Sequence, residues 1–357
     1  MIIYIDKSIG ERGKSEGFSA EEEMLFNQLA YAHIKGDCFL CGNIGSLDHL
    51  NASLGVSYRT VKKRYSESRT LMDAVDALLV ISYEENPDLP EFLNGKSRII
   101  SVDNAVSSRI NEQCRLLGEN LNDCAFYKLL AERYLHTYPH KIKDVNISFQ
   151  DELGGGVTTD TVFEKSIDID KHLTLCLVDS DTKHDKSTVY RNDPAIGDTA
   201  RKLLKTEKRL SEKSFFELYC LPVHEAENLI PISILKEIAN DSSPDMIPGI
   251  DCLEKLLSAG LEKAILFYDF KYGGTKVKGD PSITYWIEVG EKIGNDISFP
   301  RVAAGVLQQA IERLSEQTSA GYRRVVSVRL DDYLIPLWHE IGLKVFSWGC
   351  ANRANPS

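Results

Sequence analysis

The sequence has no uninterrupted apolar run of the roughly 20 residues needed to cross a bilayer. Its start, MIIYIDKSIG, also lacks the succession of basic, apolar and small residues that marks a secretion signal. Both absences argue against membrane insertion and export, so we expect a cytoplasmic protein without a membrane partner. A hydrophobic share of 43% and a charged share of 27% are typical of a globular chain.

Cysteine is present but forms no disulfide or zinc pattern. The eight cysteines are scattered along 357 residues, and only CFLC (Cys38 and Cys41) has the spacing of metal ligands. No second CxxC and no nearby histidine pair accompanies it. We therefore predict reduced, packed thiols.

Positive charge is scarce relative to negative charge, and the formal net charge is -11. Such a balance argues against a protein that coats long duplexes through a general electrostatic field. Two basic segments, 58–69 and 201–213, leave local contacts with nucleic acid open. Each segment alone is typical of a solvated helix face.

Apolar runs alternate with helical segments in the first part of the chain, which predicts a parallel α/β domain. Ser19 and Glu22 form a capping box for a helix that begins at residue 20. A mostly helical stretch at 107–138 leads to HTYPHKIKD, which we interpret as a boundary between two α/β domains. The predicted domains are 1–140, with a sensing or partner-binding role, and 141–357, with the catalytic role. The expected strands of the first domain lie at 1–6, 37–42, 76–83 and 97–104.

Two motif-like segments have simpler explanations. SIGERGKS has Ser8 where a phosphate-binding loop needs its first glycine, so we predict a polar loop. HLNASLGVSYRTVKKRY resembles a helix-turn-helix whose second helix would present Arg59 and Lys62 to DNA. Because the segment lies between two expected strands, we predict a crossover helix instead.

The second half concentrates acidic residues at the predicted ends of strands. Glu152 precedes a run of three glycines, and the apolar strand at 173–178 runs into Asp179 and Asp181. Glu225 and Glu227 stand at the entrance to a helix. Oxygen ligands gathered from three segments are what Mg²⁺ or Mn²⁺ prefers, so these five residues are the candidate metal ligands.

Three further residues flank the acidic elements. Lys271 follows a strand expected at 263–270, where its ammonium group can reach a phosphate in a catalytic role. His184 and His224 stand next to the aspartate and glutamate pairs, and we expect both to be solvated loop residues.

The order of these elements is similar to a known family. A glutamate before a glycine-rich turn, then a strand ending in DxD, then a later acidic element resembles the TOPRIM domain of topoisomerases, primases and OLD-type nucleases. The segments VDSDTKHD, DPAIGDTARKLL and LPVHEAENLIP look most like TOPRIM-type proteins of prokaryotic mobile-element and antiphage loci. The resemblance covers residues 146–231.

The resemblance implies a Rossmann-like carboxy-terminal domain and Mg²⁺- or Mn²⁺-dependent hydrolysis of DNA or RNA, as in an antiphage endonuclease. It implies nucleic acid and a partner ATPase or other defence-system protein as partners. Glu152 would be a general base or metal ligand, Asp179 and Asp181 metal ligands, and Glu225 or Glu227 would complete a second metal site.

Two other functions remain open. Nucleotide-sugar glycosyltransferases also end a strand in DxD, although they give no role to HEAENLIP. Alternatively, the chain is a non-catalytic module in which the acidic turn organises a loop and the first domain binds a protein or nucleic acid.

Overall fold

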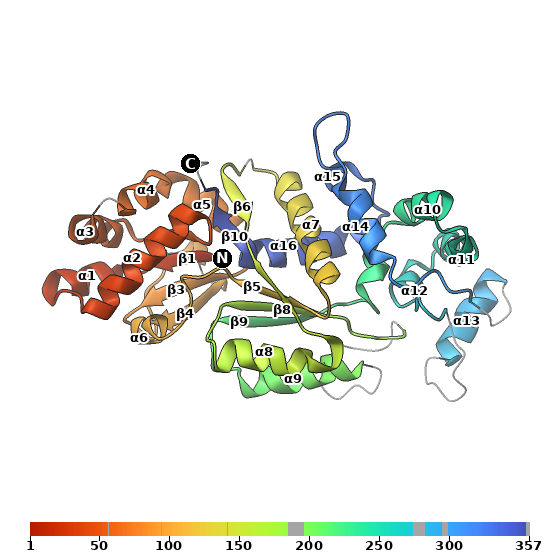
Figure 1. Cartoon of the computed structure of the whole chain (residues 1–357), viewed down its shortest axis with the longest axis horizontal. Helices are drawn as coiled ribbons and strands as arrows, with labels where there is room; N and C mark the ends of the chain where they lie inside the picture. Colours follow the sequence, from red (N-terminus) through yellow and green to blue (C-terminus); the bar gives the residue numbers. More distant parts are fainter. Residues whose placement is uncertain are drawn as a thin grey trace.

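The computed structural model describes residues 1–55, 57–93, 95–140, 142–184, 196–273, 283–294 and 299–354. Within these ranges the chain forms two four-stranded parallel sheets and one two-stranded antiparallel pair (Figure 1). The predicted α/β class with parallel sheets is confirmed. Residues 185–195, which belong to the segment that resembles the TOPRIM family, lie outside the described ranges.

The first sheet has the strand order β2-β1-β3-β4. Its first three strands along the chain are almost entirely apolar and buried, as expected for parallel strands covered on both faces. The strands are β1 (Ile2–Ile5), β2 (Phe39–Gly42), β3 (Leu78–Ser82) and β4 (Ser97–Ser101). The helices of this part are α1 (Lys7–Ser15), α2 (Ala20–Lys35), α3 (Ile44–Leu54), α4 (Ser57–Lys63), α5 (Tyr65–Asp73), η1 (Glu91–Leu93) and α6 (Val102–Val106).

Local sequence explains most of these elements. The Ser19–Glu22 capping box is present at the start of α2, as predicted. The segment 8–15 is helical, not a polar loop, because Asp6 caps α1 by accepting a hydrogen bond from the Ser8 amide. The helix-turn-helix-like segment forms α3 and α4 between β2 and β3, which confirms the predicted crossover.

The second sheet has the order β7-β5-β8-β9, with every neighbouring pair parallel. β5 lies inside the stretch that we expected to be helical, and it pairs with both β7 and β8. The change from one sheet to the other therefore falls between Ser101 and Arg115, ahead of the boundary expected at residue 140. The strands are β5 (Arg115–Gly118), β7 (Gln150–Leu153), β8 (Thr174–Val178) and β9 (Phe216–Cys220).

Helices cover both faces of the second sheet (Figure 1). α8 and α9 lie on one face, while α7 and α16 pack against each other on the opposite side. The helices of this part are α7 (Leu121–Thr137), η2 (Gly156–Thr158), α8 (Thr159–Asp168), α9 (Asp198–Arg209), η3 (Ala226–Leu229), α10 (Ile232–Asp241), η4 (Pro244–Met246), α11 (Ile247–Ser258), α12 (Glu262–Leu266), α13 (Ile283–Ile293), α14 (Leu307–Ser315), α15 (Arg324–Ser327) and α16 (Leu334–Gly349).

One predicted strand of the second half is absent. The segment 263–270 forms the short helix α12 followed by a loop, although its run of apolar residues was compatible with a strand. Its apolar side chains are still buried, among them Ile265, Tyr268 and Phe270. Short apolar runs are ambiguous between buried strand and buried helix, and here the contacts with α11 and η3 decide for the helix.

The carboxy-terminal segment returns to the first sheet. β10 (Cys350–Asn352) pairs antiparallel with β6 (Val145–Ile147). The Asn352 amide donates to the carbonyl oxygen of Cys38 (3.0 Å), and its side-chain amide donates to that of His33 (3.0 Å). Figure 1 shows both marked termini near the first sheet. The last strand thus ties the two regions together.

No helix in the described ranges combines the length and the apolar character needed to cross a bilayer. The predicted packing of the cysteines is confirmed for CFLC, where Cys38 and Cys41 are buried. Burial raises the pKa of both thiols, so they stay protonated and unreactive.

Candidate functional site

The site lies at the carboxyl edge of the second sheet, where open α/β sheets hold their ligands. Figure 1 shows helices α10 to α13 beyond this edge. Ionisable side chains reach it from three strand ends and from one loop after α12. They are Glu119 and Asp123 after β5, Asp179 and Asp181 after β8, His224, Glu225 and Glu227 after β9, and Asp269 and Lys271 after α12.

The DxD turn after β8 is fixed by hydrogen bonds to the loop after β9. The Ser180 hydroxyl donates to the Val223 carbonyl oxygen (2.6 Å), and the Asp181 amide donates to that of His224 (2.9 Å). Asp181 adopts a left-handed backbone with φ 51°. That conformation is uncommon for a residue with a side chain and frequent at functional turns, and here it places successive carboxylates on the same edge.

The loop after β9 is held by one buried amide. Asn228 donates from Nδ2 to the carbonyl oxygens of Ile265 and Tyr268, both at 2.8 Å, and accepts from the Glu225 amide (2.9 Å). The side chain therefore ties the two glutamates to the segment that bears Asp269 and Lys271. Asn228 positions the site, whereas the sequence showed only its place beside two acidic residues.

The sequence analysis did not identify Glu119, which lies near the other carboxylates of the site. It directly follows β5, and Asn120 and Asp123 then form the capping box that starts α7. Burial, followed by the negative charges of Asp181 and Asp123, raises the pKa of Glu119 to about 7. The signal was the run Leu116-Leu117-Gly118 followed by a helix cap, which indicates a short strand ending at residue 118.

The carboxylates destabilise one another's charged forms. Burial and the nearby charges of Asp123, Glu119 and Glu227 raise the pKa of Asp179 well above its usual value. Burial and Glu225 raise the pKa of Glu227 to about 7. Asp179 accepts a hydrogen bond from the Ala226 amide (3.0 Å), which holds its carboxylate in place but leaves it among like charges. The predicted DxD and the predicted glutamate pair thus do converge.

A second group of ligand types lies beside this cluster. One atom each of His224, Glu225 and Asp269 lies within 4.8 Å of the others, close enough to hold a metal ion. His224 is buried, unlike the solvated loop residue that we expected, and its Nδ1 lies 3.1 Å from the Thr182 carbonyl oxygen. Asp269 is fixed by the amides of Lys271 (3.0 Å) and Tyr272 (2.9 Å), so its orientation is set by the backbone.

Lys271 supplies the positive charge of the site. Its Nζ lies 3.0 Å from Glu225 Oε2, while the Phe270 amide donates to Glu225 Oε1 (3.3 Å). Burial lowers the pKa of Lys271, but the carboxylate of Glu225 outweighs burial and raises it above its usual value. Glu225 is therefore partly neutralised by a cation, and Glu227 is the glutamate left among other carboxylates.

Gly197 brings helix α9 against the DxD turn. The Gly197 amide donates to the Ser180 carbonyl oxygen (2.8 Å), and a Cβ placed on Gly197 would lie 1.9 Å from Asp181 Oδ2. Only a residue without a side chain allows this approach. The start of α9 and the Asp181 carboxylate are consequently in contact.

Glu152 occupies a different environment from the one that we expected. It lies within the edge strand β7, and its carboxylate is 3.8 Å from the Arg115 guanidinium, which also binds Asp170 (2.9 Å). Among the described residues, no ion pair or hydrogen bond joins it to the acidic cluster. Glu119, in contrast to Glu152, lies near the carboxylates of the acidic cluster. The glycines that follow do turn sharply, since Gly155 and Gly156 have positive φ angles.

Comparisons with known proteins add no assignment. No family model matches the chain, and neither the curated proteins nor the solved structures gave a significant match. Any function must therefore be inferred from the site itself.

Proposed function

We propose that the chain is a TOPRIM-like, metal-dependent phosphodiesterase that cleaves nucleic acid as an endonuclease. The observation that supports it is the convergence of Glu119, the DxD pair and Glu227 at the carboxyl edge of one parallel sheet. Such a group of like charges is costly without cations and well suited to hold them. A two-domain arrangement, with the first sheet in a sensing or partner-binding role, is part of the same proposal, as is action in antiphage defence with a partner ATPase.

The donor set fits Mg²⁺ or Mn²⁺. Carboxylate oxygens predominate, and His224 adds a nitrogen ligand that Mn²⁺ accepts. When bound, two such ions activate an attacking water and stabilise the leaving oxygen of a phosphodiester. His224, Glu225 and Asp269 would hold one ion. The carboxylates beside them, Asp179, Asp181, Glu227 and Glu119, would contribute to the second.

The remaining side chains have supporting roles. Lys271 keeps its charge at neutral pH and stands beside the carboxylates, where its ammonium group would stabilise negative charge on a phosphate. Asn228 holds the loop that presents Glu225 and Glu227. Glu225 orients Lys271 through the 3.0 Å ion pair.

Purified protein with plasmid, single-stranded DNA and structured RNA, each with Mn²⁺, Mg²⁺ or EDTA, tests the proposal. We expect metal-dependent cleavage of at least one substrate and its loss in Asp179→Asn. This variant keeps an oxygen that can accept from the Ala226 amide, so the fold should be preserved. Metal-dependent cleavage that persists at the wild-type rate in Asp179→Asn would refute the assignment.

Thermal melts separate the proposal from its rivals. A ligand that binds only the native state stabilises it by about 2.7 kcal/mol at a hundredfold excess over its dissociation constant. We expect Mn²⁺ to raise the melting temperature of the wild type, and less so for Asp181→Ala and Glu227→Ala. A glycosyltransferase-type DxD would keep the shift in Glu227→Ala, and a non-catalytic acidic turn would show no shift at all.

A further inference from the structure

Helix α9 carries basic residues of two kinds. Some form ion pairs with other described residues. Arg201 pairs with Asp198 in the same helix, and Arg209 pairs with Glu164 of α8 (2.7 Å). Lys213, just after the helix, pairs with Asp168 of α8. These contacts explain part of the basic composition of segment 201–213 as structural.

The other basic residues of α9 form a ridge. Lys202, Lys205 and Lys208 are exposed and have no ion pair in the described part of the chain. They recur every third residue, which places them along one inclined row of the helix surface. The opposite side of α9 buries Ala200, Leu203 and Leu204 against the sheet. We call Lys202, Lys205 and Lys208 the lysine ridge.

The acidic residues near the ridge have other neighbours in the described part of the chain. Glu207 lies on the side of α9 toward β9, since its charge, after burial, raises the pKa of Cys220. Glu164 and Asp168 of α8 are already paired with Arg209 and Lys213. In a chain with a net charge of -11, three lysines in a row without an ion pair among the described residues form a local positive surface.

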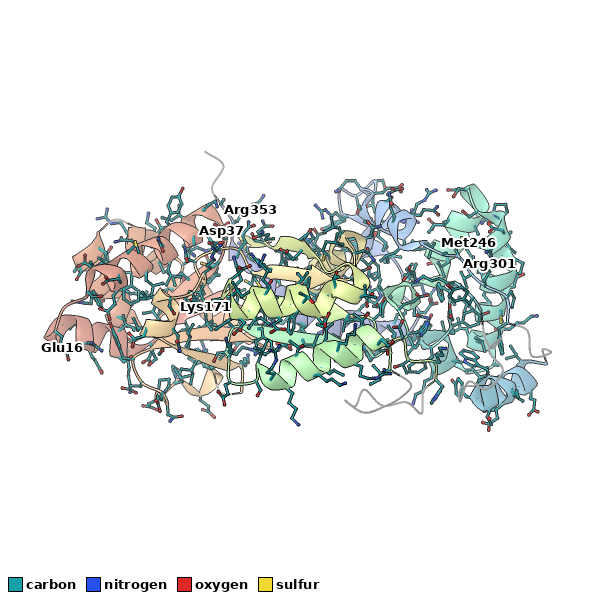
Figure 2. All side chains as sticks on the ribbon, turned by 60° about the horizontal axis from the view of Figure 1, so that its bottom comes forward. Glu16, Asp37, Lys171, Met246, Arg301 and Arg353 are labelled. Carbon is teal, nitrogen blue, oxygen red and sulfur yellow. The ribbon has the colours of Figure 1, made fainter. Side chains whose placement is uncertain are left out.

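The ridge begins at the acidic cluster. Gly197 contacts the DxD turn, and with a rise of 1.5 Å per residue Lys202 lies about 7 Å and Lys208 about 16 Å along the helix axis from it. In Figure 2, which turns the bottom of Figure 1 forward, α8 and α9 occupy the face toward the reader and their side chains project into solvent. The exposed side of α9 therefore lies on an open face of the molecule, and the helix starts at the DxD turn.

We propose that the lysine ridge binds the phosphate backbone of the nucleic-acid strand whose scissile phosphate lies at the acidic cluster. Successive ridge lysines are about 4.5 Å apart along the axis, and phosphates of one strand of a duplex advance about 3.4 Å per nucleotide. Flexible lysine side chains accommodate that difference, so the ridge of about 9 Å spans about three phosphates. The inference rests on the proposed function and names the substrate contact of the same site.

The contact is electrostatic and independent of base sequence, which gives it a measurable signature. Each phosphate neutralised contributes about 0.9 to the slope of log affinity against log salt for a duplex and about 0.7 for a single strand. Loss of three contacts should therefore reduce the slope by about 2–3. Over the decade from 1 M to 0.1 M salt, that reduction corresponds to about 100-fold weaker binding or more at 0.1 M.

The test compares two triple variants of equal net charge. The ridge variant is Lys202→Glu with Lys205→Glu and Lys208→Glu. The control reverses three exposed lysines that lie elsewhere and have no ion pair in the described part of the chain, namely Lys14, Lys63 and Lys255. Fluorescence anisotropy with labelled single-stranded DNA, duplex DNA and RNA over a salt series reports binding. Each protein also carries Asp179→Asn, so that the probe stays intact.

Three readouts decide the outcome. We expect the ridge variant to bind nucleic acid about 100-fold more weakly or more at 0.1 M salt, with the slope of log affinity against log salt reduced by about 2–3. The affinity of the control should stay within about threefold of the parent. When Asp179 is intact, the Mn²⁺-dependent melting shift should be unchanged in both variants. In cleavage assays with Asp179 intact, the ridge variant should raise KM with little change in kcat.

Two results would overturn the ridge while leaving the proposed function standing: a ridge variant that binds like the parent, or a control that loses as much affinity as the ridge variant. Wild-type protein that neither binds nor cleaves any of the three nucleic acids would overturn the proposed function and the ridge together.

Discussion

The two parallel sheets have the same strand order and use their carboxyl edges differently. In each, the second strand along the chain lies outside the first, and the third and fourth follow on the other side: β2-β1-β3-β4 and β7-β5-β8-β9. At the first sheet, the polar residues at the strand ends cap the helices that follow. Asp6 caps α1, Asn43 caps α3 and Ser101 caps α6.

At the second sheet, the strand-end carboxylates remain among like charges. Asp6 accepts from the Ser8 amide (3.1 Å) and the Ser82 hydroxyl (3.0 Å). Asp179 has one backbone donor and several carboxylate neighbours, and burial with those neighbours raises its pKa. The same strand order thus supports one edge whose polar side chains are hydrogen-bonded and another whose carboxylates repel one another. The chemistry follows from side chains placed at strand ends and not from the sheet order.

The largest expected effect is the loss of cleavage in a variant of Asp179, compared with a loss of stability in a variant of Asp6. Mutation of a residue that hydrogen-bonds a metal ligand typically lowers metal affinity or activity about 10–100-fold. Loss of a ligand itself, as in Asp179→Asn, should therefore reduce the cleavage rate by more than about 100-fold. Its melting temperature without metal should be equal or higher, since repulsion is relieved. Asp6→Ala should instead lose about 2–3 kcal/mol of unfolding free energy, from a missing cap and a buried hydroxyl left unpaired. Activity per folded molecule and denaturant unfolding measure both. Equal effects of the two variants on activity would break the comparison.

The next effect distinguishes two glutamates of the second sheet. Glu119→Gln should weaken Mn²⁺ binding at least about tenfold, because the carboxylate lies inside the cluster. Glu152→Gln should leave Mn²⁺ binding within about twofold, because its neighbour is Arg115. Mn²⁺ titration followed by calorimetry gives both dissociation constants. A larger loss in Glu152→Gln would restore the role that the sequence suggested for it.

Two glycines test the close approaches at the two edges. In Gly197→Ala the new Cβ would overlap Asp181 Oδ2, so the carboxylate must move and Mn²⁺ affinity should fall by about tenfold. In Gly10→Ala the Cβ would lie 2.7 Å from the Ser46 Cα, so backbone must shift and stability should fall by about 1–3 kcal/mol without loss of Mn²⁺ affinity. The same calorimetric titration, combined with urea unfolding, reports both. Normal metal affinity in Gly197→Ala would show that Asp181 is free to turn away.

The smallest effect is a difference in pH response without metal. Burial, and then Arg64, lower the pKa of His33 in α2 to about 3, so its contribution to stability is full above pH 6.5 and is lost as the pH falls toward 3. Glu119 and Glu227 have pKa values raised to about 7, so the native state binds more protons than the unfolded state between about pH 4.5 and 7. Their contribution therefore declines as the pH rises through that window.

Hydrogen exchange of β2 and β8 between pH 5 and 8 in EDTA, corrected for the intrinsic pH dependence, measures this contrast. Protection of β8 should decline with rising pH and that of β2 should not. Mn²⁺ should remove the decline in β8, because it binds the ionised carboxylates. The same pH response in both strands would contradict the assignment of the pKa shifts to separate regions.

The sequence predicted the parts of this structure that depend on local pattern. The parallel α/β class, the Ser19–Glu22 cap and the carboxylates of DxD and HEAEN follow from strand-end positions and helix caps visible in short windows. β5 was not recognised, because it has four residues, lies inside a helix-like stretch and is marked only by a short apolar run before a helix cap. Its partners β7 and β8 are more than 30 residues further along the chain. Without β5, Glu119 had no strand end to follow, and the glycine-rich turn drew the assignment to Glu152.

The pairing of Asn352 with Cys38 has a consequence for synthesis of the protein. A ribosome adding about 5–20 residues per second completes β2 roughly 15–60 s before it delivers the segment that covers it. During that interval β2, an edge strand of its sheet, lacks the contacts with β10 and the residue before it lacks the hydrogen bond from Asn352, a state prone to pairing with other chains. Translation that stops before Cys350 would leave that edge bare permanently. Truncated products should therefore aggregate through β2 even though the strands and carboxylates of the second sheet are already present in them.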